Sequence, residues 1–230
     1  RVPLNEGGRK KNTSATLTLR NDGAWGGGRG IKKAFYLIEK GNADVPAALL
    51  LDHSASTTDT TYQVNDLSNL RIRSGAGDDV FQLGVTPIEI DGGGGINVAG
   101  YGLAKTGMTI DMSKGKNISL WVGSKFSNQV RGTSGNDAYR SADATVADVV
   151  SLGDGDDTAM VGDGSTVNMG AGDDKTFFLG TPEDADGGSG TDIASYQQMT
   201  SGLTFAHMGN LRNYEAFVGT EHADWVSVSN

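Results

Sequence analysis

Aspartates recur in this chain at the ends of short glycine-rich motifs. The motifs follow a six-residue pattern, Gly-Gly-x-Gly-x-Asp, with some positions altered. The copies end at Asp79, Asn97, Asp137, Asp157, Asp174, Asp192 and Asp224. Steps of 17, 18 and 20 residues define one period, and the steps of 40 and 32 residues are close to two periods. A fixed period of this kind indicates a repeat architecture.

Carboxylates at this spacing form a row if the chain coils with about 18 residues per turn. Stacked parallel strands lie about 4.8 Å apart, so equivalent aspartates would lie equally close. Bare carboxylates at that distance repel one another, and a divalent cation between turns removes the repulsion. Calcium suits such a row because it accepts about six to eight oxygen ligands, including backbone carbonyls. We therefore expect about three tightly held calcium ions, with one or two weaker ones.

Short apolar segments between the motifs predict the strands that position these carboxylates. They are VFQL at 80–83, TAMV at 158–161, TVNM at 166–169, TFFL at 176–179 and IASY at 193–196. Glycine supplies the positive-φ backbone that tight bends between such strands need. The sequence thus predicts an all-β fold, a parallel β-roll (β-solenoid) with about 18 residues per turn.

A longer repeat overlies the short one, with an offset of 95 residues. The segment GAGDD at 75–79 recurs at 170–174, Asp91 matches Asp186, and Tyr101 matches Tyr196. We therefore predict two related modules, at about 75–140 and 170–230, within a repeat region spanning 74–230.

The motifs resemble the nonapeptide repeat of the RTX (repeats-in-toxin), or hemolysin-type calcium-binding, family. The resemblance covers about residues 74–230 and implies a right-handed parallel β-roll with calcium in its turns. The side-chain ligands that it implies are Asp79, Asp137, Asp157, Asp174 and Asp192, with Asn97 as a weaker carbonyl ligand. The backbone oxygens that it implies are near Gly77, Gly135, Gly155, Gly172 and Gly190. The opposite bends offer only Asp163 and Glu183, so we expect ions mainly on one side.

Residues 1–73 lack the motif and are expected to form a β-rich segment that caps or continues the solenoid. Strands are predicted at 14–21 and in TTYQV and NLRIR before the first motif. The segment IKKAFYLIEKG at 31–41 fits a strand or a short helix, and its Phe-Tyr-Leu-Ile cluster favours the strand. Pro46 argues against a long helix through the apolar segment that contains it.

Composition narrows the class of partner. The net charge is −9, so the acidic repeat region would repel phosphates, and no nucleic-acid partner is expected. Cysteine is absent, which removes disulfides and thiol chemistry. No apolar run approaches the roughly 20 residues of a transmembrane helix, so no transmembrane segment is expected.

No motif predicts catalysis. His53, His207 and His222 lack the spacing of a zinc protease, and the chain has no Gly-x-Ser-x-Gly elbow. Asp52, His53 and Ser54 have the composition of a triad, but adjacent residues rarely converge as one. The predicted role is that of a non-enzymatic module.

Three functional hypotheses remain. The first is a calcium-binding structural module of a large secreted bacterial toxin or adhesin that folds when it meets calcium outside the cell. The second is a non-catalytic module of a secreted epimerase, protease or lipase. The third is a carbohydrate-binding β-solenoid that uses tryptophans such as Trp121. The predicted partners are calcium ions and a host-cell surface or glycan, and the predicted location is extracellular or on the bacterial surface. We interpret the chain, which runs from Arg1 to Asn230, as a piece of a longer protein.

Overall fold

The computed structural model describes residues 34–38, 49–204 and 209–225. Within these residues the protein is an all-β parallel β-solenoid with about 19 residues per turn and no α-helix, which confirms the predicted fold class. The short 3-10 helix η1, Met112–Lys114, lies among the strands. The chain divides into two compact units: unit 1 is Arg1–Ala104 with Lys114–Ser119, and unit 2 is Lys105–Ser113 with Leu120–Asn230.

Unit 1 contains two sets of parallel strands. One set has the order β1-β3-β5-β7, with bounds Ala34–Ile38, Thr60–Val64, Val80–Leu83 and Val98–Gly100. The other has the order β2-β4-β6-β9, with bounds Leu49–Asp52, Leu70–Arg73, Glu89–Asp91 and Gly115–Lys116. Most strands pair with the next strand but one along the chain, so one strand from each set makes up one turn. Strands on both sides of residue 74 share these sheets.

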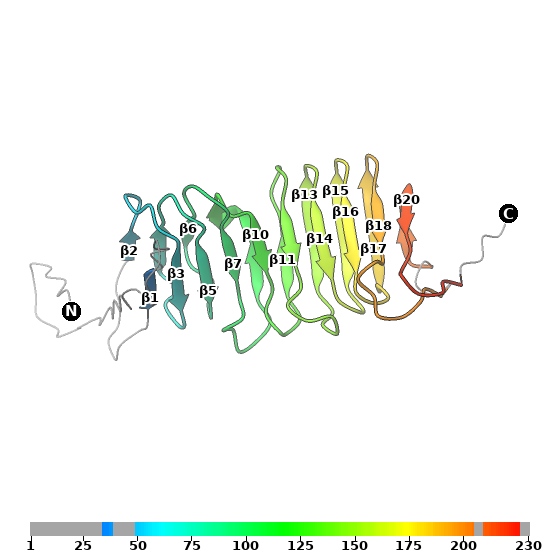
Figure 1. The fold of residues 1–230 in the computed structure, drawn as a ribbon, viewed down its shortest axis with the longest axis horizontal. Coiled ribbons are helices and arrows are strands. Elements are labelled where there is room, and N and C mark those ends of the chain that lie inside the picture. Colours follow the sequence, from blue (N-terminus) through cyan, green and yellow to red (C-terminus); the bar gives the residue numbers. More distant parts are fainter. Residues whose placement is uncertain (1–33, 39–48, 205–208, 226–230) are drawn as a thin grey trace, which may run out of the picture. The chain divides into compact units, whose positions relative to one another are not determined.

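Unit 2 repeats this arrangement. One set has the order β10-β12-β14-β16-β18-β20, with bounds Leu120–Val122, Ala138–Arg140, Thr158–Val161, Lys175–Phe178, Ile193–Ser195 and Ala216–Val218. The other has the order β8-β11-β13-β15-β17-β19, with bounds Thr109–Asp111, Gln129–Arg131, Val149–Asp154, Thr166–Ala171, Asp184–Ser189 and Leu211–Arg212. Figure 1 shows these strands stacked turn upon turn.

The core consists of columns of inward-facing side chains, one from each turn. Alternate residues of a strand point to opposite faces, so every second residue is buried, as in β3. In unit 1, Tyr62 and Phe81 occupy the same register and their rings stack with centroids 5.0 Å apart. In unit 2, the rings of Phe178 and Tyr196 stack at 5.1 Å. The core is therefore thin, and each layer is covered by the next turn.

The strands expected from the apolar segments are present. VFQL, TAMV, TVNM, TFFL and IASY correspond to β5, β14, β15, β16 and β18, with small shifts of the ends. TTYQV and NLRIR form β3 and β4, and the segment at 31–41 contains strand β1. The predicted strand at 14–21 lies outside the described residues.

Candidate metal centre

An inner column of aspartates lies where one set of strands begins. Asp157, Asp174 and Asp192 directly precede β14, β16 and β18, and Asp79 precedes β5 in unit 1. All four side chains are almost completely buried, with relative exposures of 0–1%. The parallel register of the strands that follow places the three aspartates of unit 2 at equivalent positions of successive turns. The sequence prediction of a carboxylate row is thus met by the backbone of unit 2.

Each inner aspartate uses one oxygen to cap the preceding turn. Asp157 Oδ1 accepts a hydrogen bond from the backbone N–H of Asp137 at 2.7 Å. Asp174 Oδ1 accepts from the Asp157 N–H at 2.7 Å, and Asp192 Oδ1 accepts from the Asp174 N–H at 2.9 Å. These bonds satisfy backbone donors between turns, so the carboxylates also have a structural role that the sequence analysis did not include.

The second oxygen of each inner aspartate has no hydrogen-bond partner. Oδ2 of Asp79, Asp157, Asp174 and Asp192 is buried and accepts no hydrogen bond. Leaving a buried acceptor unsatisfied costs about 1–3 kcal/mol, and more if it is charged. The column therefore contains strong acceptors that need either a proton or a cation.

Burial makes these carboxyls reluctant to ionise. Desolvation raises the pKa of Asp157 to about 7, and the nearby Asp137 and Asp174 carboxylates add to the rise. Burial also raises the pKa of Asp174 and of Asp192, while the N–H groups that they cap lower it in part. In unit 1, burial raises the pKa of Asp79 despite the hydrogen bond from the backbone N–H of Thr60, which lowers it. A bound cation would offset the same desolvation.

An outer column runs beside the inner one. Asp156 and Asp173, the residues just before Asp157 and Asp174, are exposed. Asp156 Oδ1 accepts from the Asp173 N–H at 3.0 Å, and Asp173 Oδ1 accepts from the Thr191 N–H at 2.8 Å. The outer carboxylates cap the following turn and the inner ones the preceding turn, and the outer column faces solvent.

Glycines keep the turn backbones close to one another. Gly170 has a φ of 115°, and a Cβ atom added to it would lie 1.7 Å from the carbonyl oxygen of Gly153. Gly155, Gly172 and Gly190 also have positive φ. A Cβ on Gly172 would lie 2.2 Å from the Gly155 carbonyl oxygen, so these backbones stack without room for side chains. That their carbonyl oxygens bind an ion stays a prediction, as it does for Gly77 and Gly135.

Two predicted ligands have other partners in the structure. Asp137 is partly exposed, and its Oδ2 accepts from the N–H and the hydroxyl of Thr133 at 2.6 and 2.9 Å. Asn97 is buried, and its amide nitrogen donates to the carbonyl oxygens of Gly94 and Asn117 at 3.1 and 2.9 Å.

On the opposite bends, Asp163 Oδ1 accepts a hydrogen bond from the Thr181 N–H at 2.8 Å. Glu183 is exposed.

Asp148 is a buried carboxylate that the motif search missed. It directly precedes β13, and its Oδ1 accepts from the backbone N–H and side-chain amide of Asn128 at 2.8 and 2.9 Å. Its Oδ2 accepts from the hydroxyls of Tyr139, at 2.8 Å, and Ser141. Burial and this carboxylate raise the pKa of Tyr139. The signal in the sequence was an aspartate immediately before a strand, without the glycines. Because both oxygens have donors, Asp148 needs no ion.

Side chains alone do not form a complete metal shell. Within the described residues, no group of three or more His, Cys, Asp or Glu side chains is placed to hold a metal ion. Any cation at the inner column would therefore take most of its ligands from backbone oxygens, which Ca²⁺ accepts readily.

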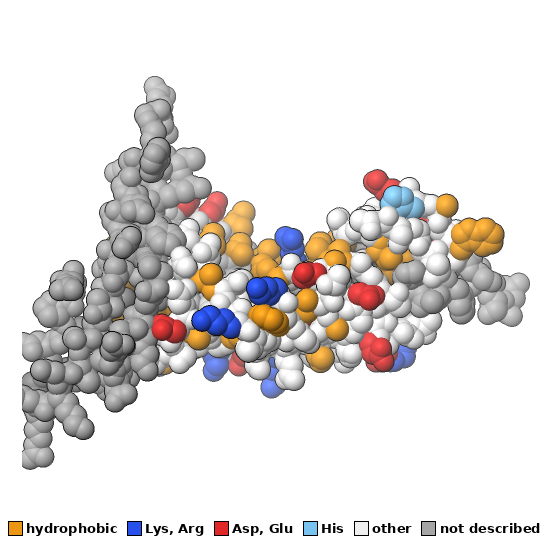
Figure 2. All heavy atoms as spheres, turned by 90° about the horizontal axis from the view of Figure 1, so that it is seen from below, with side chains coloured by type: hydrophobic (Ala, Val, Ile, Leu, Met, Phe, Trp, Pro, Cys, Tyr) orange, Lys and Arg blue, Asp and Glu red, His pale blue; other side chains and the backbone are white. Residues whose placement is uncertain are grey.

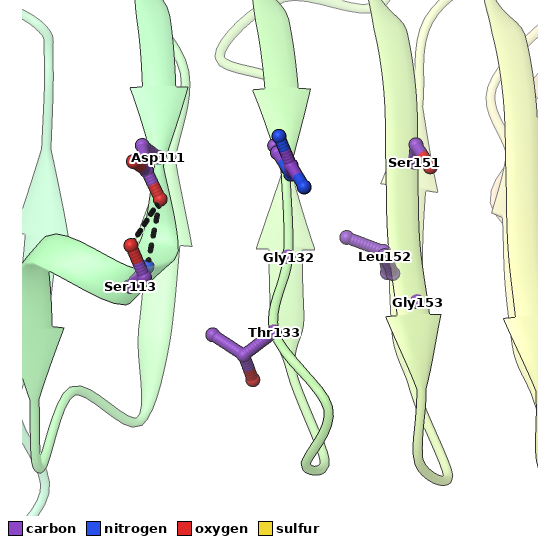
Figure 3. A pocket seen from close by; sticks show the side chains of 8 residues that line it. Asp111, Ser113, Gly132, Thr133, Ser151, Leu152 and Gly153 are labelled. Carbon is purple, nitrogen blue, oxygen red and sulfur yellow. Dashed lines mark hydrogen bonds between the residues drawn. The ribbon is translucent and has the colours of Figure 1, made fainter.

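The described residues do not assemble a catalytic triad at His53. Its Nδ1 lies 3.1 Å from the Tyr62 hydroxyl, and Asp52 Oδ1 instead accepts from the backbone N–H of Ser54 at 3.0 Å. A shallow pocket of about 490 Å³ opens in unit 2 between β8, β11 and β13 (Figure 3). It is lined by Asp111, Ser113, Arg131, Gly132, Thr133, Ser151, Leu152 and Gly153, and none of these is an inner aspartate.

The surface offers little support for a sugar-stacking platform. Trp121 is 3% exposed, so its ring packs inside unit 2, whereas Trp225 is 82% exposed. Charged side chains of both signs are dispersed over the face in Figure 2 and do not gather in one patch.

Comparison with known proteins found no matching family model, no matching curated protein and no matching solved structure. Among the described residues, no helix is long and apolar enough to span a membrane.

Proposed function

We propose that this β-solenoid is a calcium-binding structural module, and that the inner aspartate column is its metal site. One observation carries the proposal: Asp79, Asp157, Asp174 and Asp192 each bury a carboxylate oxygen that has no partner. A fold that stacks such oxygens turn upon turn accumulates unfavourable charge unless a counter-ion is bound.

Calcium fits this donor set better than other ions. The available donors are carboxylate and backbone carbonyl oxygens, which are hard ligands, and cysteine is absent from the chain. Magnesium demands near-ideal octahedral geometry and keeps its waters, so it suits a dry column poorly. The residues that would hold the ion are the four inner aspartates, assisted by turn carbonyls such as those near Gly155, Gly172 and Gly190. The ion would supply the positive charge that the column lacks.

The biological role that follows is structural. Since a site divided between turns does not exist in an unfolded chain, calcium binding would be coupled to folding. A chain with a net charge of −9 would stay extended at low calcium and fold in an extracellular medium. The RTX-like motifs support a module of a secreted bacterial toxin or adhesin. The same module beside an enzyme domain remains the alternative.

The test is a calcium titration of the protein in which thermal melting is followed by far-UV circular dichroism. We expect the melting temperature to rise with calcium and to fall in EGTA, because the ion binds the folded state. The double variant Asp157→Asn/Asp174→Asn should lose most of this response. The matched control, Asp156→Asn/Asp173→Asn, changes the exposed neighbours and should keep it. A wild-type melting curve that is the same in calcium and EGTA would overturn the proposal.

A further inference from the structure

The two related modules contain a natural comparison at the inner column. Asn97 in unit 1 and Asp192 in unit 2 hold the same position of the longer repeat. Asn97 Oδ1 accepts from the Asp79 N–H at 2.9 Å, and Asp192 Oδ1 accepts from the Asp174 N–H at 2.9 Å. Oδ1 of each side chain therefore accepts the same kind of hydrogen bond, from the backbone N–H of the preceding turn.

The backbone beside these two residues is also the same. Asn117 and Asn213, in the following turns, have positive φ values of 55° and 53°. Their side-chain amides donate to Oδ1 of Asp91 and Asp186 at 2.8 and 2.7 Å. The modules thus fix an equivalent asparagine in an equivalent conformation next to the column.

A carbonyl oxygen lines the column in both modules. A Cβ atom built on Gly92 would lie 2.5 Å from the Asn117 carbonyl oxygen and 2.7 Å from Asn97 Cγ. On Gly187 it would lie 2.1 Å from the Asn213 carbonyl oxygen and 3.0 Å from Asp192 Cγ. The two side chains therefore occupy equivalent positions, each between a glycine and the backbone carbonyl of an equivalent asparagine.

The second side-chain atom distinguishes the two turns. Asn97 Nδ2 donates to the carbonyl oxygens of Asn117 and Gly94, so this position is satisfied by N–H groups. Asp192 presents an oxygen there, and that oxygen has no donor. An oxygen placed against carbonyl oxygens is repelled, and the missing component is a positive charge.

Asp137 is satisfied in a different way, by the residue four positions before it. Thr133 donates its N–H and hydroxyl to Asp137 Oδ2. Thr220 likewise donates to Asp224, from its N–H at 3.2 Å and its hydroxyl at 2.8 Å. The four aspartates with an unpartnered oxygen have glycine at that position: Gly75, Gly153, Gly170 and Gly188.

We propose that Asn97 and Thr133 are built-in substitutes for the cation. The amide of Asn97 and the hydroxyl of Thr133 donate hydrogen bonds to oxygens that would otherwise need a bound cation. Cation sites are thereby confined to Asp79, Asp157, Asp174 and Asp192, and three of the four lie in consecutive turns of unit 2. This assignment rests on the proposed function, and it removes Asn97 and Asp137 from the ligands expected from the sequence.

The test exchanges the two side chains. Asn97→Asp should add one calcium ion per chain in native mass spectrometry and isothermal calorimetry with calcium chloride. In EGTA its melting temperature should fall by about 2–10 °C, because a buried acceptor loses its donors. Asp192→Asn should bind one ion fewer and should melt no lower than wild type in EGTA.

A second variant guards against misfolding of the first. Thr133→Gly keeps the backbone N–H but removes the hydroxyl donor, and it introduces the glycine that the four sites with an unpartnered oxygen have at this position, so it should also add one ion. Thr133→Ser keeps the hydroxyl and should bind as wild type does. If wild type binds calcium and neither Asn97→Asp nor Thr133→Gly changes the stoichiometry, the substitution hypothesis is wrong while the calcium module stands. If wild type binds no calcium, both proposals fall.

Discussion

Neighbouring aspartates of this protein have different physical environments. Asp156 is exposed and Asp157 is buried, although they are adjacent, because successive residues of an extended chain point to opposite faces. The Asp156 side chain faces solvent, whereas Asp157 has one oxygen bonded to a backbone N–H and one buried oxygen without a donor. The pair shows why a count of acidic residues overestimates the number of carboxylates available inside the solenoid.

The raised pKa of Asp157 predicts an inverted pH dependence without calcium. Its folded-state pKa is about 7, against 3.8 for an ordinary aspartate, so the folded state holds the proton more tightly. Between these values the unfolded chain loses the proton first, and the free energy of unfolding falls as the pH rises from about 4 to 7.

The measurement is urea unfolding in EGTA at several pH values. Wild type should be less stable at pH 7.5 than at pH 5, and Asp157→Asn should flatten the slope. Asp156→Asn serves as the control and should flatten the slope much less, because burial, and not the Asp156 charge, is the main cause of the raised pKa of Asp157. Stability that rises over this range in EGTA would show that Asp157 is not the dominant titrating group.

At the scale of the element, the turns are the most restrictive parts of the fold. Several of them place a positive-φ glycine against a carbonyl of the adjacent turn, as at Gly170 and Gly153. Strands can shift by a residue at their ends, but these bends leave no room for a β-carbon. The glycines therefore fix the register that aligns the carboxylates.

Gly170→Ala is expected to destabilise the protein by at least about 1–2 kcal/mol, the cost of a left-handed conformation for an L-residue. The added methyl group also meets the Gly153 carbonyl, which is backbone and cannot rotate away. Gly102→Ala is the matched control, since no atom lies within 4 Å of its Cβ position. Chemical unfolding of both variants in calcium provides the comparison, and equal stability of the two would contradict the steric argument.

At the scale of the whole molecule, the two units differ in how their columns are satisfied. Unit 2 has three consecutive aspartates with an unpartnered oxygen, at 157, 174 and 192. In unit 1, the unpartnered Asp79 oxygen is followed in the next turn by Asn97, whose amide nitrogen has hydrogen-bond partners. Dependence on calcium should therefore be concentrated in unit 2.

Hydrogen exchange followed by mass spectrometry checks this distribution. On addition of calcium, peptides covering 149–196 should gain more protection than peptides covering 60–104, because local opening exposes more uncompensated carboxylates in unit 2. Equal gains in both regions would argue against it. The Asp157→Asn/Asp174→Asn protein is the control, and the difference should shrink there.

Much of the fold was predictable because each copy of the repeat has the same pattern of residue types, and therefore indicates the same local structure. The period of 17–20 residues and segments such as TAMV predicted parallel strands that pair with their equivalents in the next turn. Asp148 was missed because no glycine motif precedes it, although its partner Asn128 lies one turn earlier and Tyr139 lies within the same turn. The hydrogen bond that each inner aspartate accepts from a backbone N–H of the preceding turn was not foreseen, because it joins atoms of different turns.

The sequence by itself determined the coil and the positions at which carboxylates recur, since both follow from period and residue type. Only the tertiary structure decided which carboxylate oxygens are left without a donor. That outcome depends on contacts within and between turns: Thr133 donates to Asp137 in the same bend, the Asn97 amide donates to the carbonyl of Asn117 in the following turn, and no donor reaches Asp192 Oδ2. Hydrogen bonding acts over about 3 Å, a distance that the order of residues along the chain does not specify.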